Sequence, residues 1–186
     1  VIPNTVDVKK LPTKNGIKKT VGEMWDAYTE FSLGEDSFSN MIINYIEQMM
    51  PEYLESARAY LSGSSHHGFN CYIMRRDLFE QMCEMQFPIM KRFEDDCASF
   101  GIVSEGRTVG YLGEALNGLF IHYLINERKV SYKELQLVFF HNTTRGNAFF
   151  KKIKFRIKSI FGALLSLFFP RGSKRRRWLK KLLVHQ

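Results

Sequence analysis

The stretch from His66 to Glu94, "HHGFNCYIMRRDLFEQMCEMQFPIMKRFE", joins a short apolar run to a long helical pattern. Residues 68–74, "GFNCYIM", are mostly apolar and are bounded by a glycine and by two arginines, which predicts a short buried strand. Asp77 then begins an amphipathic helix, in which Pro88 is expected to introduce a kink or a break. A strand that leads directly into a helix indicates a mixed α/β domain.

The same two patterns recur on either side of this stretch. Apolar spacing predicts helices over residues 20–31, 38–50, 51–62 and 111–125, and apolar runs predict strands over residues 1–8 and 135–140. Asp36 or Ser37 is the expected N-cap of the second of these helices, and Pro51 separates it from the third. Ligands of open α/β sheets bind beyond the carboxyl ends of the strands, where we expect Asn70 and His141.

The composition fits one folded domain. Of 186 residues, 45% are hydrophobic and 14% are aromatic, which supplies a packed core and argues against disorder. Cys71, Cys83 and Cys97 have no CxxC spacing, so we expect free thiols in a reducing compartment. No apolar run approaches the roughly 20 residues that span a bilayer. The sequence starts at Val1 within a predicted strand, and we therefore expect earlier elements of the domain in a longer protein.

The net charge of +8 is unevenly distributed along the chain. Residues 145–186 contain 13 Lys or Arg and no Asp or Glu, whereas residues 1–144 contain 14 Lys or Arg and 19 Asp or Glu, a net charge of −5. We therefore expect an α/β domain over residues 1–144 and a basic tail over residues 145–186. A basic tail on an acidic body predicts an anionic partner for the tail alone.

The tail has the pattern of an amphipathic helix that lies on a membrane. Apolar residues between positions 149 and 168 share one helical face, and most of the neighbouring basic residues lie opposite. The predicted contacts with an anionic membrane come from Lys151, Lys152, Lys158, Arg175, Arg176, Arg177 and Trp178. An edge strand is an alternative, because "KKIKFRIK" also alternates with period two. Nucleic-acid binding is disfavoured, because the basic run is short and no recognition fold accompanies it.

A first group of candidate binding residues lies in the loop before the predicted strand at 68–74. His66 and His67 could donate hydrogen bonds to a phosphate or a sugar, or they could be loop residues that contact only solvent. The adjacent pair lacks the i,i+4 spacing of a helical metal site, so it does not form one alone. Asn70 could present its amide to a sugar hydroxyl or be a satisfied polar group within the strand.

A second group lies in "GRTVGYLGEALN", residues 106–117. Arg107 supplies a planar cation suited to phosphate or carboxylate, and Gly110 allows close approach to the backbone. Glu114 could accept a proton from a hydroxyl or bind sugar hydroxyls, although a carboxylate near a helix start also stabilises the helix dipole. The glycine spacing matches neither a Rossmann fingerprint nor a P-loop. The acidic run at residues 94–96 fits a solvated helix end better than a metal site.

The order of these motifs resembles the family known as domain of unknown function 4422, glycosyltransferases of bacterial capsular and exopolysaccharide loci. The resemblance covers about residues 1–142. It is carried by Pro51-Glu52-Tyr53, by Asn70 to Met74, by Phe79 to Glu94, and by Arg107, Gly110, Tyr111 and Glu114. The sequence departs from the family pattern at Cys71, where methionine is usual, and at Ala115, where arginine is usual.

The resemblance implies a GT-A-like nucleotide-sugar transferase fold, of which this chain would be the C-terminal, acceptor-side portion. The implied reaction moves a sugar from a nucleotide-sugar donor to a polysaccharide or lipid-linked glycan acceptor. A divalent cation, Mg²⁺ or Mn²⁺, is the implied cofactor. Under the same resemblance Asn70 would contact a sugar, Arg107 would contact the diphosphate or an acidic sugar, and Glu114 would be the base.

The resemblance and the tail together predict a location in the cytoplasm, at the inner face of the cell membrane, because lipid-linked acceptors are presented there. The alternative function is a non-catalytic fragment that docks at the membrane or acts as a scaffold in polysaccharide biosynthesis. An intact donor-binding half in a longer protein would favour the enzyme over the scaffold.

Overall fold

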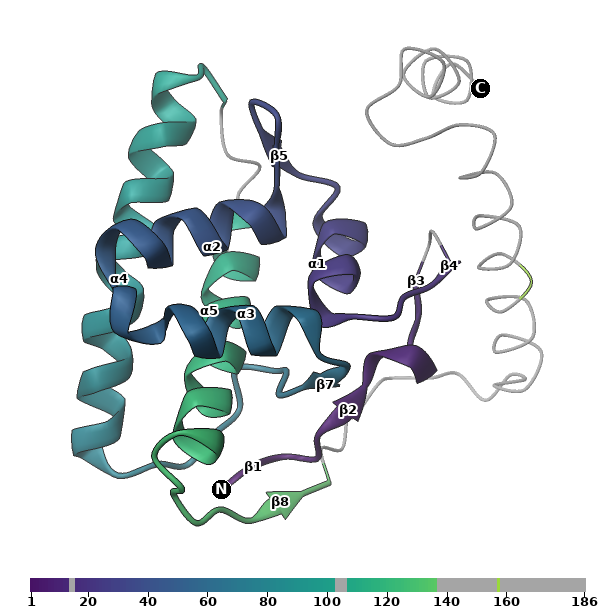
Figure 1. Cartoon of the computed structure of the whole chain (residues 1–186), viewed down its shortest axis with the longest axis vertical. Helices are drawn as coiled ribbons and strands as arrows, with labels where there is room; N and C mark the ends of the chain where they lie inside the picture. The colour runs from purple at the N-terminus through teal and green to yellow at the C-terminus, as the bar shows by residue number, and fades with distance from the viewer. Residues whose placement is uncertain (14–15, 103–106, 137–156, 158–186) are drawn as a thin grey trace, which may run out of the picture. The chain divides into compact units, whose positions relative to one another are not determined.

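The computed structural model describes residues 1–13, 16–102, 107–136 and 157 (Figure 1). The chain divides into two compact units, one of residues 1–11 and 18–141 and one of residues 12–17 and 142–186. In the second unit, the described elements are the strands β3 (Pro12–Thr13) and β4 (Gly16–Ile17), which form an antiparallel pair. The predicted tail helix and its membrane contacts lie outside the described residues.

The first unit is mixed α/β and mostly helical, which confirms the predicted class in its coarse form. Its helices are α1 (Val21–Thr29), α2 (Phe38–Met49), α3 (Leu54–Ser62), α4 (Arg76–Ser99) and α5 (Thr108–Asn126), with 3₁₀ turns at Val8–Lys10 and Pro51–Tyr53. Every helix predicted from apolar spacing is present, because that spacing puts one face of each helix in the core. None of the described helices is both long enough and apolar enough to span a membrane.

Side-chain caps fix where the first helices begin. The Thr20 hydroxyl accepts a hydrogen bond from the Glu23 backbone N–H at 3.1 Å, and the Glu23 carboxylate accepts one from the backbone of Lys19 at 2.8 Å. Ser37 caps α2 by accepting from the Asn40 N–H at 3.3 Å, as the sequence predicted. These bonds satisfy donors that a helix start would otherwise leave unpaired.

Helix α4 is one continuous element, so of the two predicted effects of Pro88, a kink or a break, the break is wrong. Pro88 lies on the exposed side of α4. The carbonyl that loses its N–H partner there can be hydrogen-bonded by water, and the opposite face still packs in the core.

The predicted strand over residues 68–74 is also wrong, because this segment is an irregular loop. Phe69 has a left-handed backbone with φ of 68°, which interrupts any extended run, and Cys71 N–H bonds back to the Phe69 carbonyl at 2.6 Å. Only Ile73 pairs in a strand-like way, through two backbone hydrogen bonds with Val1. Four of the supposed strand residues, Phe69, Asn70, Cys71 and Ile73, are exposed.

The observed strands are short and join distant parts of the chain. Strands β1 (Ile2–Pro3) and β8 (Glu134–Leu135) pair in parallel, and β2 (Val6–Asp7) pairs antiparallel with β7 (Ser65–His66). Strands β5 (Ser32–Leu33) and β6 (Asp36–Ser37) form a hairpin before α2. The strand predicted over residues 135–140 is thus described only at its start, within β8.

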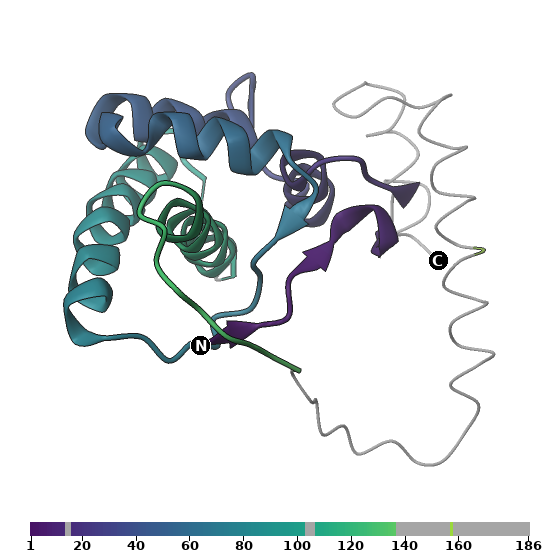
Figure 2. The same ribbon diagram turned by 60° about the horizontal axis from the view of Figure 1, so that its bottom comes forward.

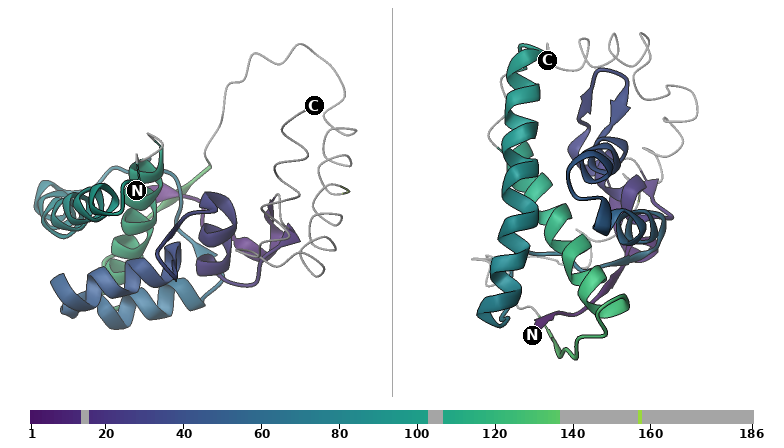
Figure 3. Two further views of the ribbon diagram at one scale, coloured as in Figure 1. Left: turned by 90° about the horizontal axis from the view of Figure 1, so that it is seen from above. Right: turned by 60° about the vertical axis from the view of Figure 1, so that its left-hand side comes forward.

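Helix α5 lies at the centre of the first unit, with α4 along one side and α1, α2 and α3 around it (Figures 2 and 3). Burial of apolar side chains on these helices forms one core, which provides the main stabilisation of the fold. The largest fully buried side chains include Phe38, Ile42, Tyr60, Phe93, Leu116 and Phe120. Tyr28 of α1 is 59% exposed, and its ring packs at the surface against Tyr111 of α5.

Candidate functional site

The predicted residues of α5 share one face of that helix. Arg107, Gly110, Tyr111 and Glu114 are spaced i, i+3, i+4 and i+7, which aligns them along the helix axis. The guanidinium carbon of Arg107 lies 5.6 Å from the centroid of the Tyr111 ring, a cation–π contact. A side chain at Gly110 would meet open space, so packing does not require glycine there.

The loop before α4 meets this face at Glu114. The backbone N–H of Phe69 donates a hydrogen bond to Oε1 of Glu114 at 3.1 Å. The left-handed conformation of Phe69 turns the chain at this contact, and the next residue, Asn70, is exposed. The structure therefore brings the segment of Asn70 to Glu114, although 45 residues separate the two bonded positions.

Helix α1 contributes an aromatic residue to the same face. The Tyr28 ring packs edge to face against Tyr111, with centroids 5.0 Å apart, and against the buried Trp25 at 6.1 Å. Burial raises the pKa of Tyr28, Tyr111 and the Glu114 carboxylate raise it further, and Arg107 opposes them. Tyr28 thus lies within electrostatic range of both charged residues. We call the surface formed by these residues the Glu114 face: Tyr28, Phe69, Asn70, Arg107, Gly110, Tyr111 and Glu114.

His66 and His67 do not lie on the Glu114 face, since they are only 5% and 7% exposed. Nδ1 of His66 shares a hydrogen bond with the Tyr60 hydroxyl at 2.8 Å. Thr5 donates its hydroxyl proton to Glu134, so it accepts its bond of 3.2 Å from Nδ1–H of His67. We call these five residues, Thr5, Tyr60, His66, His67 and Glu134, the buried histidine network.

Burial keeps both histidines of this network uncharged. It lowers the pKa of His66 to about 4, helped by the neighbouring His67, and it lowers the pKa of His67 to about 4 as well, helped by His122. Two glycines make room for the network, because a Cβ at Gly68 would collide with His66 and a Cβ at Gly118 would collide with Tyr60. A ligand in solvent therefore reaches Asn70 without reaching either imidazole.

Glu114 lies between the exposed face and the buried network. Burial raises the pKa of the Tyr60 hydroxyl strongly, and the charge of Glu114 adds to the rise. The nearby Trp25 indole lowers the pKa of Tyr60 and so opposes this rise. Nε1 of Trp25 has no hydrogen-bond partner among the described residues. The same carboxylate thus acts on the buried Tyr60 and on the exposed Tyr28.

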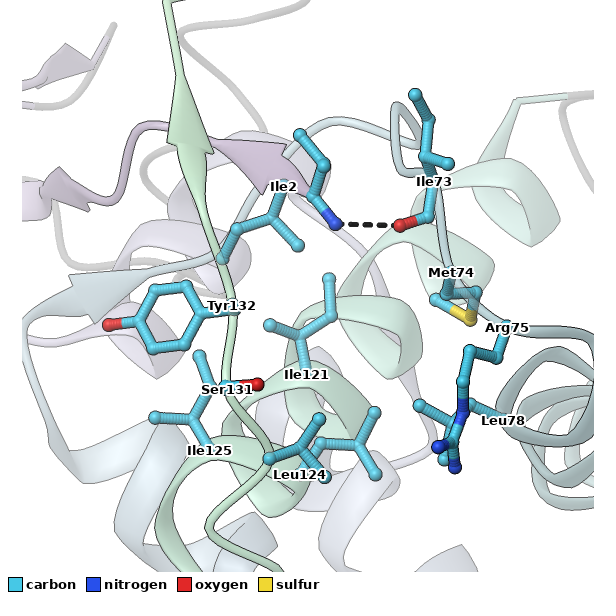
Figure 4. Close-up of a pocket in the computed structure, with 12 residues that line it drawn as sticks. Ile2, Ile73, Met74, Arg75, Leu78, Ile121, Leu124, Ile125, Ser131 and Tyr132 are labelled. Atoms are coloured by element: carbon cyan, nitrogen blue, oxygen red, sulfur yellow. Dashed lines mark hydrogen bonds between the residues drawn. The ribbon is translucent and has the colours of Figure 1, made fainter.

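A separate cavity of about 390 Å³ lies at the other end of α5 (Figure 4). Its lining is mainly aliphatic and includes Ile2, Ile73, Met74, Leu78, Ile121 and Leu124. No residue predicted for the site lines it. The hydrogen bond from the Val1 amine to the Ile73 carbonyl, 2.6 Å long, crosses its edge.

The acidic run at residues 94–96 is engaged in ion pairs. Lys91 pairs with Asp95, and Arg92 pairs with Asp96, which also accepts a hydrogen bond from the Tyr45 hydroxyl at 2.9 Å. Within residues 1–13, 16–102 and 107–136, no cluster of three or more His, Cys, Asp or Glu side chains could hold a metal ion. The three cysteines are free, as predicted.

The fold and the Glu114 face define a mixed α/β domain whose helices α1 and α5 present a carboxylate, a guanidinium and aromatic rings on one partly exposed surface. The family model described as Domain of unknown function (DUF4422) matches residues 10–127, more than half of the chain, and the chain belongs to this family. The matched range contains the whole of the Glu114 face. Neither a curated protein nor a solved structure shows significant similarity to the chain.

Proposed function

We propose that the chain is the acceptor-side portion of a GT-A-like glycosyltransferase, which moves a sugar from a nucleotide-sugar donor to a polysaccharide or lipid-linked glycan acceptor. The observation that carries the proposal is a carboxylate, Glu114, held by a backbone N–H on an exposed face. The resemblance to capsular and exopolysaccharide glycosyltransferases supplies the reaction class.

Glu114 is suited to the role of general base. Only its Oε1 accepts a hydrogen bond from the residues that the structure describes, so Oε2 is available to an acceptor hydroxyl. In the proposed step the hydroxyl proton passes to Glu114 as the hydroxyl oxygen bonds to the anomeric carbon. The bond from that carbon to the donor phosphate breaks, and the nucleoside diphosphate leaves with the electron pair.

Arg107 and Asn70 would hold the substrates around this carboxylate. No described carboxylate lies within ion-pair distance of Arg107, and its contact with Tyr111 fixes the guanidinium at the start of α5. Such a cation fits a diphosphate or an acidic sugar. The exposed Asn70 amide supplies donors and an acceptor for sugar hydroxyls.

The test is sugar transfer by the intact protein across a panel of nucleotide sugars, with Glu114→Gln as the variant. Glutamine can still accept the Phe69 N–H bond but cannot take a proton, so transfer should fall by about 10²-fold or more. Glu84→Gln, at an exposed position on α4, is the matched control for the loss of one negative charge. Near-wild-type turnover of Glu114→Gln would remove Glu114 from catalysis.

Membrane attachment through the tail is a separate part of the proposal, and it is supported by the charge pattern of residues 145–186. It accounts for access to a lipid-linked acceptor at the inner face of the cell membrane. Replacement of the seven predicted contact residues by serine should abolish flotation with vesicles that contain anionic lipid. Retained flotation would contradict the attachment, and a shift of DNA at equal protein concentration would favour nucleic acid instead.

A further inference from the structure

Tyr28 is an exposed aromatic residue whose ring is held in place. It is 59% exposed, yet Tyr111 packs against it at an interplanar angle of 79° and Trp25 packs against it at 83°. These contacts come from two helices, α5 and α1 itself, so the ring has a fixed orientation. An aromatic surface fixed in this way offers a stacking partner at little conformational entropy cost.

Charged groups of both signs surround this ring. Arg107 lies over the Tyr111 ring, which packs against Tyr28, and Glu114 follows Tyr111 one turn later on α5. After burial and Tyr111, both charges also act on the pKa of Tyr28. The two residues are seven positions apart on α5, about 10 Å along the helix axis. The guanidinium carbon of Arg107 lies over the Tyr111 ring, and no described carboxylate forms an ion pair with this side chain.

We infer that the Glu114 face binds an acidic pyranose, with the sugar ring stacked on Tyr28 and its carboxylate paired with Arg107. The C–H face of a pyranose is apolar and packs on an aromatic ring, whereas its hydroxyls seek acceptors such as Glu114. A carboxylate on the ring matches the two N–H donors of a guanidinium. The inference rests on the proposed function, because it names the sugar class for the same site.

The experiment measures sugar binding rather than transfer. Saturation-transfer NMR with the full chain compares methyl glucuronide with methyl glucoside, which differ in the carboxylate. The glucuronide should bind more tightly, and Tyr28→Ala should weaken both sugars by about tenfold, since loss of about 1.4 kcal/mol of stacking corresponds to that factor. Tyr28→Phe keeps the ring and should retain binding. Arg107→Gln should abolish the preference for glucuronide.

Three results would overturn the inference: no binding of either sugar by the wild type, equal binding of the two, or unchanged binding by Tyr28→Ala. Circular dichroism checks that the variants are folded. Failure here is distinguishable from failure of the transferase proposal. If Tyr28→Ala binds sugar unchanged and Glu114→Gln loses transfer, the acidic-sugar site is wrong and the enzyme proposal stands. If Tyr28→Ala loses sugar binding and Glu114→Gln keeps transfer, the sugar-binding site stands and Glu114 is not catalytic.

Discussion

The Glu114 face and the buried histidine network lie on two sides of one loop, and their polar groups have opposite environments. In the network the Nδ1 atoms of His66 and His67 are hydrogen-bonded to protein groups and shielded from water. On the face, Asn70 and Arg107 are exposed. His67 and Asn70 are only three positions apart in the loop, but substitution of His67 should affect stability, whereas substitution of Asn70 should affect binding. The network contributes to stability, and the face is available to a ligand.

The largest expected effect concerns pH and stability. Both histidines have a pKa of about 4 when folded and about 6.5 when unfolded, so the unfolded chain binds more protons between these values. Their stabilisation is complete above pH 6.5 and is lost as the pH falls toward 4, by about 3 kcal/mol for each histidine. Urea unfolding between pH 7.5 and 4 measures this loss. A constant free energy of unfolding over that range would show that the imidazoles are not shielded.

Two glycines of α5 have different surroundings, because Gly118 adjoins the network and Gly110 lies on the face. Gly118→Ala should lower the free energy of unfolding by about 2 kcal/mol, because its Cβ would collide with the Tyr60 hydroxyl. Gly110→Ala should instead raise it by about 0.5–1 kcal/mol, since its Cβ meets open space and alanine favours helix. Chemical denaturation of both variants provides the comparison. Equal effects at the two positions would contradict this division of α5.

Two tyrosines test the same comparison more finely. Tyr60→Phe leaves Nδ1 of the buried His66 without its partner and should cost about 1.5 kcal/mol of stability. Tyr28→Phe changes an exposed hydroxyl and should alter stability by less than about 0.5 kcal/mol. The difference in unfolding midpoint at constant denaturant slope measures both. A smaller loss for Tyr60→Phe than for Tyr28→Phe would reverse the assignment of the two regions.

The last comparison predicts a gain in stability from a change in the core. Asn117 of α5 is 1% exposed, and neither polar atom of its amide has a hydrogen-bond partner in the described structure. Asn117→Leu should therefore raise the free energy of unfolding by about 1 kcal/mol, because it removes an unpaired buried amide. Thermal unfolding would detect the rise. A decrease would mean that the amide is satisfied in solution, as the histidines of the network are.

The helices and half of the site could be predicted from local patterns. Apolar spacing located every described helix, and the motif from Arg107 to Glu114 falls on one helix face because it follows the helical period. The loop at residues 68–74 could not be predicted, since an apolar run resembles a strand until the left-handed Phe69 is known. The sequence around Tyr28 also does not indicate that its side chain is exposed while neighbouring side chains of α1 are buried.

The histidines show why burial is harder to predict than helices. His66 and His67 looked like site residues because polar groups preceded an apolar run. Their hydrogen-bond partners lie in other elements. Tyr60, the partner of His66, is in the preceding helix, and Thr5, the partner of His67, lies 62 residues earlier in the chain. Hydrogen bonds between side chains of different elements leave no periodic pattern in the sequence.

The hydrogen bond from Phe69 to Glu114 also provides a reporter of occupancy. A sugar hydroxyl bound at Oε2 of Glu114 leaves the Phe69 bond to Oε1 in place and covers it from water, so the Phe69 amide would exchange its hydrogen with solvent more slowly. Deuterium uptake at this one amide would thus follow ligand binding without a label on the sugar.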